Sequence, residues 1–263
     1  MTTNDTEREH TMNDRINRRT LILNGGAAAA AGVMLAACGS EHSGIARVGE
    51  APVATALPEA HVSDVVLLRT AESVEQLALE ALGSEVLTSK AGDTGKAAIE
   101  QFVGAHRANV AALAPLVQQH GGESFTAPNT RMMKNYVTTA TALIAESDTP
   151  DTDVLVFLHA LEGVVAATYQ AFVAWTSEPA LRSAMMSLAV VPSEQSAATA
   201  QLLRSGTAGI VPGVDKNGAD LVATLPSAFG PLSAYGITIG KVNESGARTS
   251  INMETPSLNS LEY

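Results

Sequence analysis

Polar and apolar positions follow a helical period over most of the chain between residues 62 and 206. Apolar side chains recur there at steps of three and four residues, which places them on one face of a helix. The first such face predicts a helix that begins after Ser63 and ends near Lys90. Its members are Leu68, Glu72, Glu75, Leu79, Leu82 and Val86. Because two glutamates share this face with leucines, we expect their carboxylates to be buried.

A second helix follows, and its ends are marked by capping residues. Asp93 and Thr94 can cap its start, and Gly121–Gly122 stops it. Pro115 is expected to kink it. His120 stands at its end, where a cation complements the helix dipole. The buried face consists of Phe102, His106, Asn109, Leu113 and Leu116.

The pattern predicts two further long helices after a short amphipathic segment at 129–146. Thr149, Pro150 and Asp151 form a helix start, with a capping hydroxyl, a proline at the first position and an acid in the first turn. This third helix runs to about Thr176 and carries Leu155, Leu158, Glu162, Val165, Tyr169 and Phe172 on one face. The 129–146 segment suits a crossover between two helical hairpins.

The fourth helix is predicted to begin after Ser177, which can cap it. It carries Leu181, Ala184, Leu188 and Val191 on one face. Pro192 interrupts the pattern, which resumes through Glu194 and ends at Gly206. The chain from 62 to 206 therefore predicts four long helices.

The segment 207–263 has a different pattern, with many glycines and prolines and only short apolar patches. No helix of useful length fits it, so we expect an irregular C-terminal tail. The tail is too apolar to be freely solvated. It either wraps along the helices or docks on another protein, by strand addition or extended packing.

Composition supports an all-α fold with one folded domain. The chain has 46% hydrophobic and only 4% aromatic residues, which favours closely packed helices over a sheet. Its formal net charge is −11, and this field would repel a nucleic acid. We therefore expect no nucleic-acid partner.

The N-terminus has the layout of an export signal. Arg18 and Arg19 precede a short apolar run, and the segment resembles a twin-arginine signal, although arginine pairs also occur in other export signals. Leu35–Gly39 resembles the bacterial lipobox, in which Cys38 is acylated and becomes the new N-terminus. This predicts a signal peptide at 1–37, a linker at 38–61, and anchoring through membrane lipid on the extracytoplasmic face of the cell membrane. A plain cleaved signal with an incidental cysteine is the alternative.

The segments Ala105–Leu113 and Ala160–Tyr169, with the predicted helix lengths, are similar to the ferritin-like superfamily. The resemblance covers residues 62–206 and extends to extracytoplasmic lipoprotein members. It implies an antiparallel four-helix bundle with a short crossover helix.

In the iron-binding members, two glutamates and two Glu-x-x-His pairs hold two metal ions. Glu72 and Glu162 match the lone glutamates, and Glu194 matches the first position of the second pair. His106 stands where a glutamate is expected, and two further positions depart from the pattern. These are Asn109 and Ala197, where the family has histidines. A di-iron oxidase is therefore not expected.

Two readings of these polar residues remain. In one, Glu72, His106, Glu162 and Glu194 hold a single Fe²⁺, Mn²⁺ or Zn²⁺ ion in a metal-binding ferritin-like protein. In the other, Glu72, Glu75, His106 and Glu162 form a hydrogen-bonded polar cluster without a cofactor. We prefer the second, which implies a non-catalytic binding protein or accessory subunit of a membrane-associated complex. The sequence contains no phosphate-binding loop, nucleophile elbow or His-Glu-x-x-His motif that would favour an enzyme.

Overall fold

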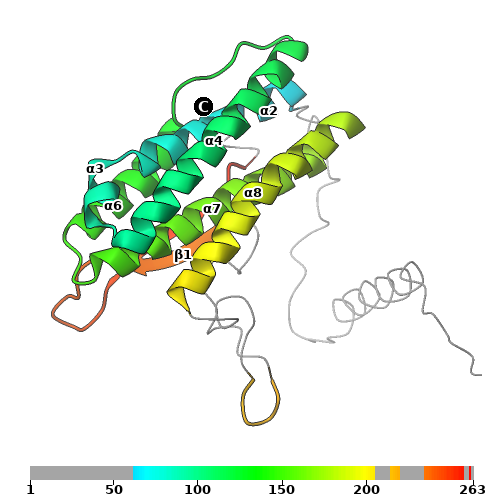
Figure 1. The fold of residues 1–263 in the computed structure, drawn as a ribbon. Helices are drawn as coiled ribbons and strands as arrows, with labels where there is room; N and C mark the ends of the chain where they lie inside the picture. Colours follow the sequence, from blue (N-terminus) through cyan, green and yellow to red (C-terminus); the bar gives the residue numbers. More distant parts are fainter. Residues whose placement is uncertain (1–61, 205–213, 220–233, 258–260, 262–263) are drawn as a thin grey trace, which may run out of the picture. The chain divides into compact units, whose positions relative to one another are not determined.

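The computed structural model describes residues 62–204, 214–219, 234–257 and 261 (Figure 1). The predicted signal peptide at 1–37 with Arg18 and Arg19, the lipidation site Cys38 and the linker at 38–61 lie outside the described residues. The anchor therefore stays a prediction.

The described part of the chain is mostly helical, as the sequence predicted. Its helices are α2 (Asp64–Leu82), α3 (Glu85–Lys90), α4 (Asp93–Gln119), α5 (Thr130–Met132), the π-helix η1 (Met133–Val137), α6 (Thr138–Ala145), α7 (Pro150–Trp175) and α8 (Pro179–Leu203). Two strands, β1 (Ala234–Ile239) and β2 (Thr249–Glu254), follow.

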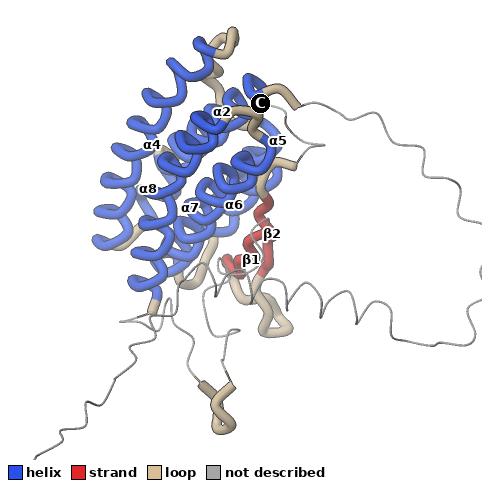
Figure 2. The backbone as a smooth tube through the Cα atoms, turned by 90° about the vertical axis from the view of Figure 1, so that its right-hand side faces the viewer, coloured by secondary structure: helices blue, strands red, loops and turns tan. Residues whose placement is uncertain are grey.

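The long helices pack as two pairs, α2 with α4 and α7 with α8 (Figures 1 and 2). Ser177, just after α7, donates its backbone N–H to Oδ1 of Asp64 at the start of α2, at 2.9 Å. His120, just after α4, lies 3.5 Å from Glu178, just before α8. The end of one helix thus meets the start of its neighbour, so adjacent long helices are antiparallel.

Several helix ends differ from the sequence prediction. The first predicted helix is broken at Gly83, and Ser84 caps the new helix α3 by accepting the Leu87 N–H at 3.2 Å. Glu178, not Ser177, is the N-cap residue of α8, and Ser177 donates its hydroxyl and its N–H to Asp64.

Pro192 does not interrupt the fourth helix, contrary to the prediction. α8 runs from Pro179 to Leu203 with Pro192 buried inside it. Packing along α7 supports α8 through this position. The start of α7 at Pro150 is confirmed, but the Thr149 side chain makes no capping hydrogen bond, contrary to the prediction.

α7 forms the centre of the domain. Every residue from Phe157 to Tyr169 is buried, because α2, α6, α8 and β1 all contact this helix. α7 is long and apolar enough to cross a membrane, but 78% of its most apolar window is buried inside the domain. A core helix of a folded domain has this property, so its hydropathy is weak support for a membrane span.

The strands form an antiparallel hairpin that the sequence analysis did not predict. One face of it is buried against the helices and consists of Tyr235, Ile237, Ile239, Ile251 and Met253. The hairpin lies beside α6 and α7 (Figure 2). A Cβ atom added to Gly163 of α7 would lie 2.7 Å from the Tyr235 ring, so a glycine allows this close contact. Part of the tail therefore packs along the helices, which is one of its two predicted roles.

A partly buried ion pair joins the hairpin to the start of α7. Asp153 is fully buried and pairs with Arg248 from the loop between the strands. Its Oδ2 atom also accepts the Gly240 N–H at 2.8 Å and the Ser147 hydroxyl at 2.6 Å. Arg248 in turn donates from Nε to the Gly240 carbonyl at 2.8 Å. This network fixes the hairpin loop on the helical domain.

Candidate functional site: a buried polar cluster

Three long helices contribute charged and polar side chains to one buried cluster. We call it the polar cluster. Its members are Glu75 from α2, His106 and Asn109 from α4, and Glu162 and Tyr169 from α7, and all are buried. Each lies on a helix face that the hydrophobic pattern marks as internal. The helical period therefore brings these polar groups together.

His106 lies at the centre of the polar cluster, between two carboxylates. Its Nδ1 atom is 2.6 Å from Oε2 of Glu75, and its Nε2 atom is 3.0 Å from Oε1 of Glu162. Burial alone would lower the pKa of His106, but the charges and hydrogen bonds of Glu162 and Glu75 raise it to about 10. At neutral pH the ring is therefore an imidazolium that donates to both carboxylates. The expected hydrogen bond between His106 and a glutamate is confirmed.

Glu75 receives hydrogen bonds at both carboxylate oxygens. Oε1 accepts from the Tyr169 hydroxyl and from the Asn109 amide at 2.9 Å, while Oε2 accepts from His106. Burial and the Glu75 charge raise the pKa of Tyr169 well above its ordinary value. Tyr169 therefore stays a neutral donor, and Glu75 is a well-satisfied carboxylate.

Glu162 is the less satisfied carboxylate of the polar cluster. Burial raises its pKa, and the His106 charge only partly opposes this effect. Among the described residues, no hydrogen-bond partner reaches its Oε2 atom. An unpaired buried carboxylate oxygen favours uptake of a proton or a cation.

Two of the four predicted metal-site residues do not join the cluster. Glu194 is exposed on α8, because that helix continues through Pro192 without a break and the side chain points to solvent. Glu72 is buried but accepts the Phe125 N–H at 2.6 Å instead of contacting His106. Burial raises the pKa of Glu72, and its hydrogen bond from the Phe125 backbone N–H and the Arg69 charge oppose this rise.

His159 also lies away from the polar cluster. Its Nδ1 atom is 2.8 Å from the Ser196 carbonyl, which links α7 to α8. Burial lowers the pKa of His159, so the ring is neutral at neutral pH. His159 is therefore a neutral core residue that links α7 to α8 and takes no part in the polar cluster.

The polar cluster does not fit the dinuclear metal site of the iron-binding ferritins. Asn109 and Ala197 stand where the family has histidines, and Glu194 and Glu72 lie outside the cluster, so four expected donors are missing. Glu75 and Glu162 contact opposite nitrogens of the His106 ring. The ring therefore separates the two carboxylates, and in this arrangement they and a ring nitrogen cannot surround one ion.

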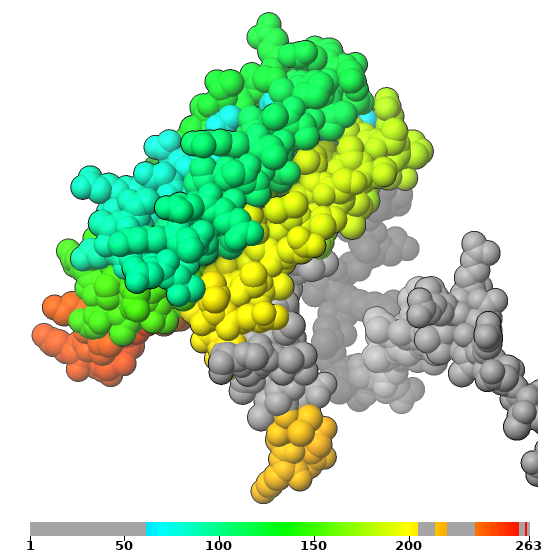
Figure 3. All heavy atoms as spheres, viewed as in Figure 1, coloured from blue at the N-terminus to red at the C-terminus, as the bar shows by residue number. Residues whose placement is uncertain are grey.

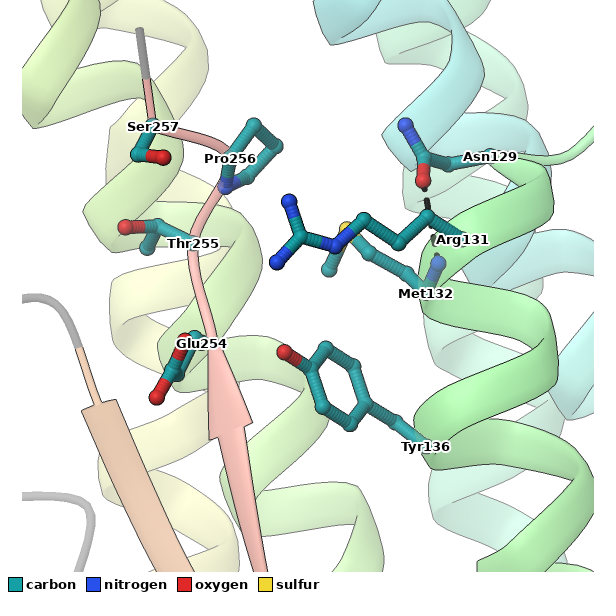
Figure 4. Close-up of a pocket in the computed structure, with 8 residues that line it drawn as sticks. All are labelled: Asn129, Arg131, Met132, Tyr136, Glu254, Thr255, Pro256 and Ser257. Atoms are coloured by element: carbon teal, nitrogen blue, oxygen red, sulfur yellow. Dashed lines mark hydrogen bonds between the residues drawn. The ribbon is translucent and has the colours of Figure 1, made fainter. Parts of the chain in front are cut away.

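Two described cavities lie elsewhere, near the end of β2. The smaller has a volume of about 20 Å³, which is room for about one water molecule. It is lined by Asn129, Arg131, Met132, Tyr136, Glu254, Thr255, Pro256 and Ser257. Figure 4 shows the Tyr136 hydroxyl directed toward Glu254, with Arg131 extended toward Pro256. Burial and the Glu254 charge raise the pKa of Tyr136, so it is a neutral phenol.

The larger cavity, of about 380 Å³, lies over α7 and is mostly apolar. It is lined by Ala167, Gln170, Ala171, Trp175, Thr255, Pro256 and Ser257. None of the polar-cluster residues lines either cavity.

Three residues of these hydrogen-bond networks had no role predicted from the sequence. Asn109 and Tyr169 lie on the predicted buried faces of their helices, so a polar group at a core position was the available signal. Arg248 carried no such signal, because its partner Asp153 lies far away in the sequence.

Comparison of the chain with protein-family models, with curated proteins and with solved structures gave no significant match.

Proposed function

We propose that this chain is a lipid-anchored, extracytoplasmic binding protein that serves as a non-catalytic accessory subunit of a membrane-associated complex. The lipobox-like sequence before Cys38 supports the anchor. We further propose that the long helices form a ferritin-like bundle. Their two antiparallel pairs, joined through the short helices α5, η1 and α6, support this fold.

The interior of the helical domain supports a non-catalytic role. Both ring nitrogens of His106 are held by carboxylates, and both oxygens of Glu75 accept hydrogen bonds. A general base needs a free lone pair within reach of a substrate proton. Since both described cavities lie away from His106, its hydrogen bonds serve the fold.

The exposed face of α8 is the observation that carries the binding role. Met186 and Val190 lie one turn apart there and are 47% and 50% exposed. Between Ser183 and Gln201 the only charged residue is Glu194, although the chain has a net charge of −11. Figure 3 shows α8 at the surface along its length. A weakly charged face with exposed apolar side chains favours contact with another protein.

The anchor is tested by replacing the lipidated thiol. We expect Cys38→Ala to move the chain from the membrane fraction to the soluble fraction, or to leave an uncleaved precursor. Ser40→Ala is the matched control and should remain in the membrane fraction. A processed Cys38→Ala chain that stays fully membrane-bound would refute the anchor.

The binding role is tested with charges on the α8 face. Native electrophoresis of detergent-extracted membranes should place the wild-type chain in an assembly larger than a monomer. The double variant Met186→Asp, Val190→Asp should shift to the monomer position. Ala108→Asp, Ala112→Asp places the same charges at the same spacing on the exposed face of α4 and should leave the assembly intact. A monomeric wild-type chain would contradict the proposal.

A single-metal protein is the alternative, and the buried Oε2 atom of Glu162 favours it, although the carboxylates around His106 would have to rearrange to bind one ion. Elemental analysis of the chain purified without chelators separates the two functions. The preferred proposal expects no metal that depends on Glu162. One equivalent of iron, manganese or zinc that disappears in Glu162→Gln would support the alternative.

A further inference from the structure

A second histidine faces two carboxylates at one end of the helical domain. His120 follows the last residue of α4, Asp64 opens α2, and Glu178 precedes α8. One ligand atom from each of these residues lies within 4.8 Å of the others. The His120 Nε2 atom is 3.5 Å from Oε2 of Glu178. We call this group the end site.

The ring of His120 is oriented by a backbone carbonyl. Its Nδ1 atom lies 2.8 Å from the Leu116 carbonyl oxygen. A carbonyl only accepts, so Nδ1 carries the hydrogen and the neutral ring has its lone pair at Nε2. This lone pair faces the Glu178 carboxylate. Two acceptors face each other favourably only when a proton or a metal ion lies between them.

The carboxylate of Asp64 is oriented as well. Ser177 donates its backbone N–H to Oδ1 at 2.9 Å and its hydroxyl to Oδ2. Each oxygen keeps a further lone pair for another ligand. Groups that hold a ligand side chain in this way are a regular feature of metal sites, because they fix its orientation before the ion binds.

The turn after α4 allows His120 to come this close to α2. Gly121 has φ +78°, a conformation that favours glycine. A Cβ atom at Gly122 would lie 2.4 Å from a methyl carbon of Val65. The glycine pair therefore brings the end of α4 into contact with the first turn of α2.

We propose that Asp64, His120 and Glu178 bind one divalent cation, with Zn²⁺ the best fit. Zinc accepts one imidazole nitrogen with carboxylate oxygens, whereas Ca²⁺ and Mg²⁺ prefer oxygen ligands alone. Tetrahedral zinc with these ligands separates neighbouring donor atoms by about 3.3 Å, close to the His120–Glu178 distance. Glu178 is 58% exposed, so the ion can enter from solvent and keep a water ligand.

Zinc at the end site would join the start of α2, the end of α4 and the start of α8. These three helix ends carry the ligands, and none of the polar-cluster residues takes part. An ion that binds only the folded chain stabilises it by mass action. The inference is independent of the proposed anchor and of the α8 face.

Titration of the metal-free full chain with ZnCl₂, followed by calorimetry, tests the proposal. We expect one zinc ion per chain and a rise in the melting temperature with zinc. Co²⁺ in place of zinc should give the visible absorption of a tetrahedral site. Excess Ca²⁺ should not displace the zinc.

Variants locate the bound ion. His120→Ala and Glu178→Gln should each weaken zinc binding at least about tenfold, because each removes a ligand. Glu123→Gln is the matched control: it removes one exposed negative charge close to His120 in the sequence and should bind zinc as the wild type does. Circular dichroism checks that all variants stay helical.

Three results would overturn the proposal. The first is the absence of stoichiometric zinc binding to the wild-type chain. The second is equal zinc affinity in Glu178→Gln and Glu123→Gln. The third is loss of zinc in His106→Gln together with unchanged binding in His120→Ala, which would move the ion to the polar cluster and support the alternative function.

Discussion

The polar cluster and the end site both place a histidine between two carboxylates, yet they have different chemistry. His106 is 1% exposed, and each of its nitrogens contacts a different glutamate. His120 is 18% exposed, and one of its nitrogens is held by a backbone carbonyl. A ring held at both nitrogens by carboxylates keeps its proton. A ring held at one nitrogen by a carbonyl has the other available for a metal ion.

The largest expected difference between the two regions is in stability. Glu162→Leu leaves the imidazolium of His106 with an unpaired, buried N–H, so it should lower the free energy of unfolding by about 3–5 kcal/mol. Glu178→Leu at the end site should change it by no more than about 0.5 kcal/mol without zinc, because Glu178 is largely exposed. Urea denaturation at pH 7 measures both. Glu162→Gln keeps the shape and should cost less than Glu162→Leu. Similar losses of unfolding free energy in Glu162→Leu and Glu178→Leu would contradict the predicted difference between the two regions.

The second difference is in the response to pH. The folded chain holds a proton on His106 up to a pKa of about 10, whereas an unfolded histidine releases it near pH 6.5. The folded state binds more protons between these values, so stability should be highest below about pH 6.5 and fall as pH rises toward 10. The raised pKa of Glu162 likewise makes the folded chain less stable as pH rises.

Two histidine variants test which residue makes the stability depend on pH. The loss of melting temperature between pH 6.5 and 9.5 should be smaller in His106→Gln than in the wild type. His120→Gln, measured without zinc, should keep the wild-type slope. If the change of melting temperature with pH depended on His120 and not on His106, this assignment would be wrong.

The smallest expected effect compares an interior glycine beside the polar cluster with a surface glycine. Gly163→Ala places a methyl group against the Tyr235 ring, and this overpacking outweighs the gain in helix propensity, for a net loss of about 1 kcal/mol. Gly104→Ala on α4 has nothing within 4 Å and should gain up to about 1 kcal/mol. Combining Gly163→Ala with Tyr235→Ala should remove the overpacking penalty. A stabilising Gly163→Ala would show that the hairpin packs loosely on α7.

The sequence by itself predicted the long helical segments and the buried positions of their polar residues, although it did not predict the break at Gly83 or the continuity of α8 through Pro192. Phe102, His106 and Asn109 lie on one predicted face of α4, and all three are buried. Glu75 and Glu162 were likewise expected inside. A helical period of 3.6 residues is a local property, so it can be read without knowing the fold. The same locality explains why the start of α7 at Pro150 was predicted correctly.

Only the tertiary structure decided which polar groups meet. Glu72 and Glu75 share a predicted face, yet Glu75 contacts His106 while Glu72 bonds the backbone of Phe125. The pairs Asp153–Arg248 and His120–Glu178 join residues from distant parts of the chain. Their formation depends on how whole helices and the hairpin pack, because a side chain acquires its partner, and with it its protonation or its capacity to bind an ion, only when those elements are brought together.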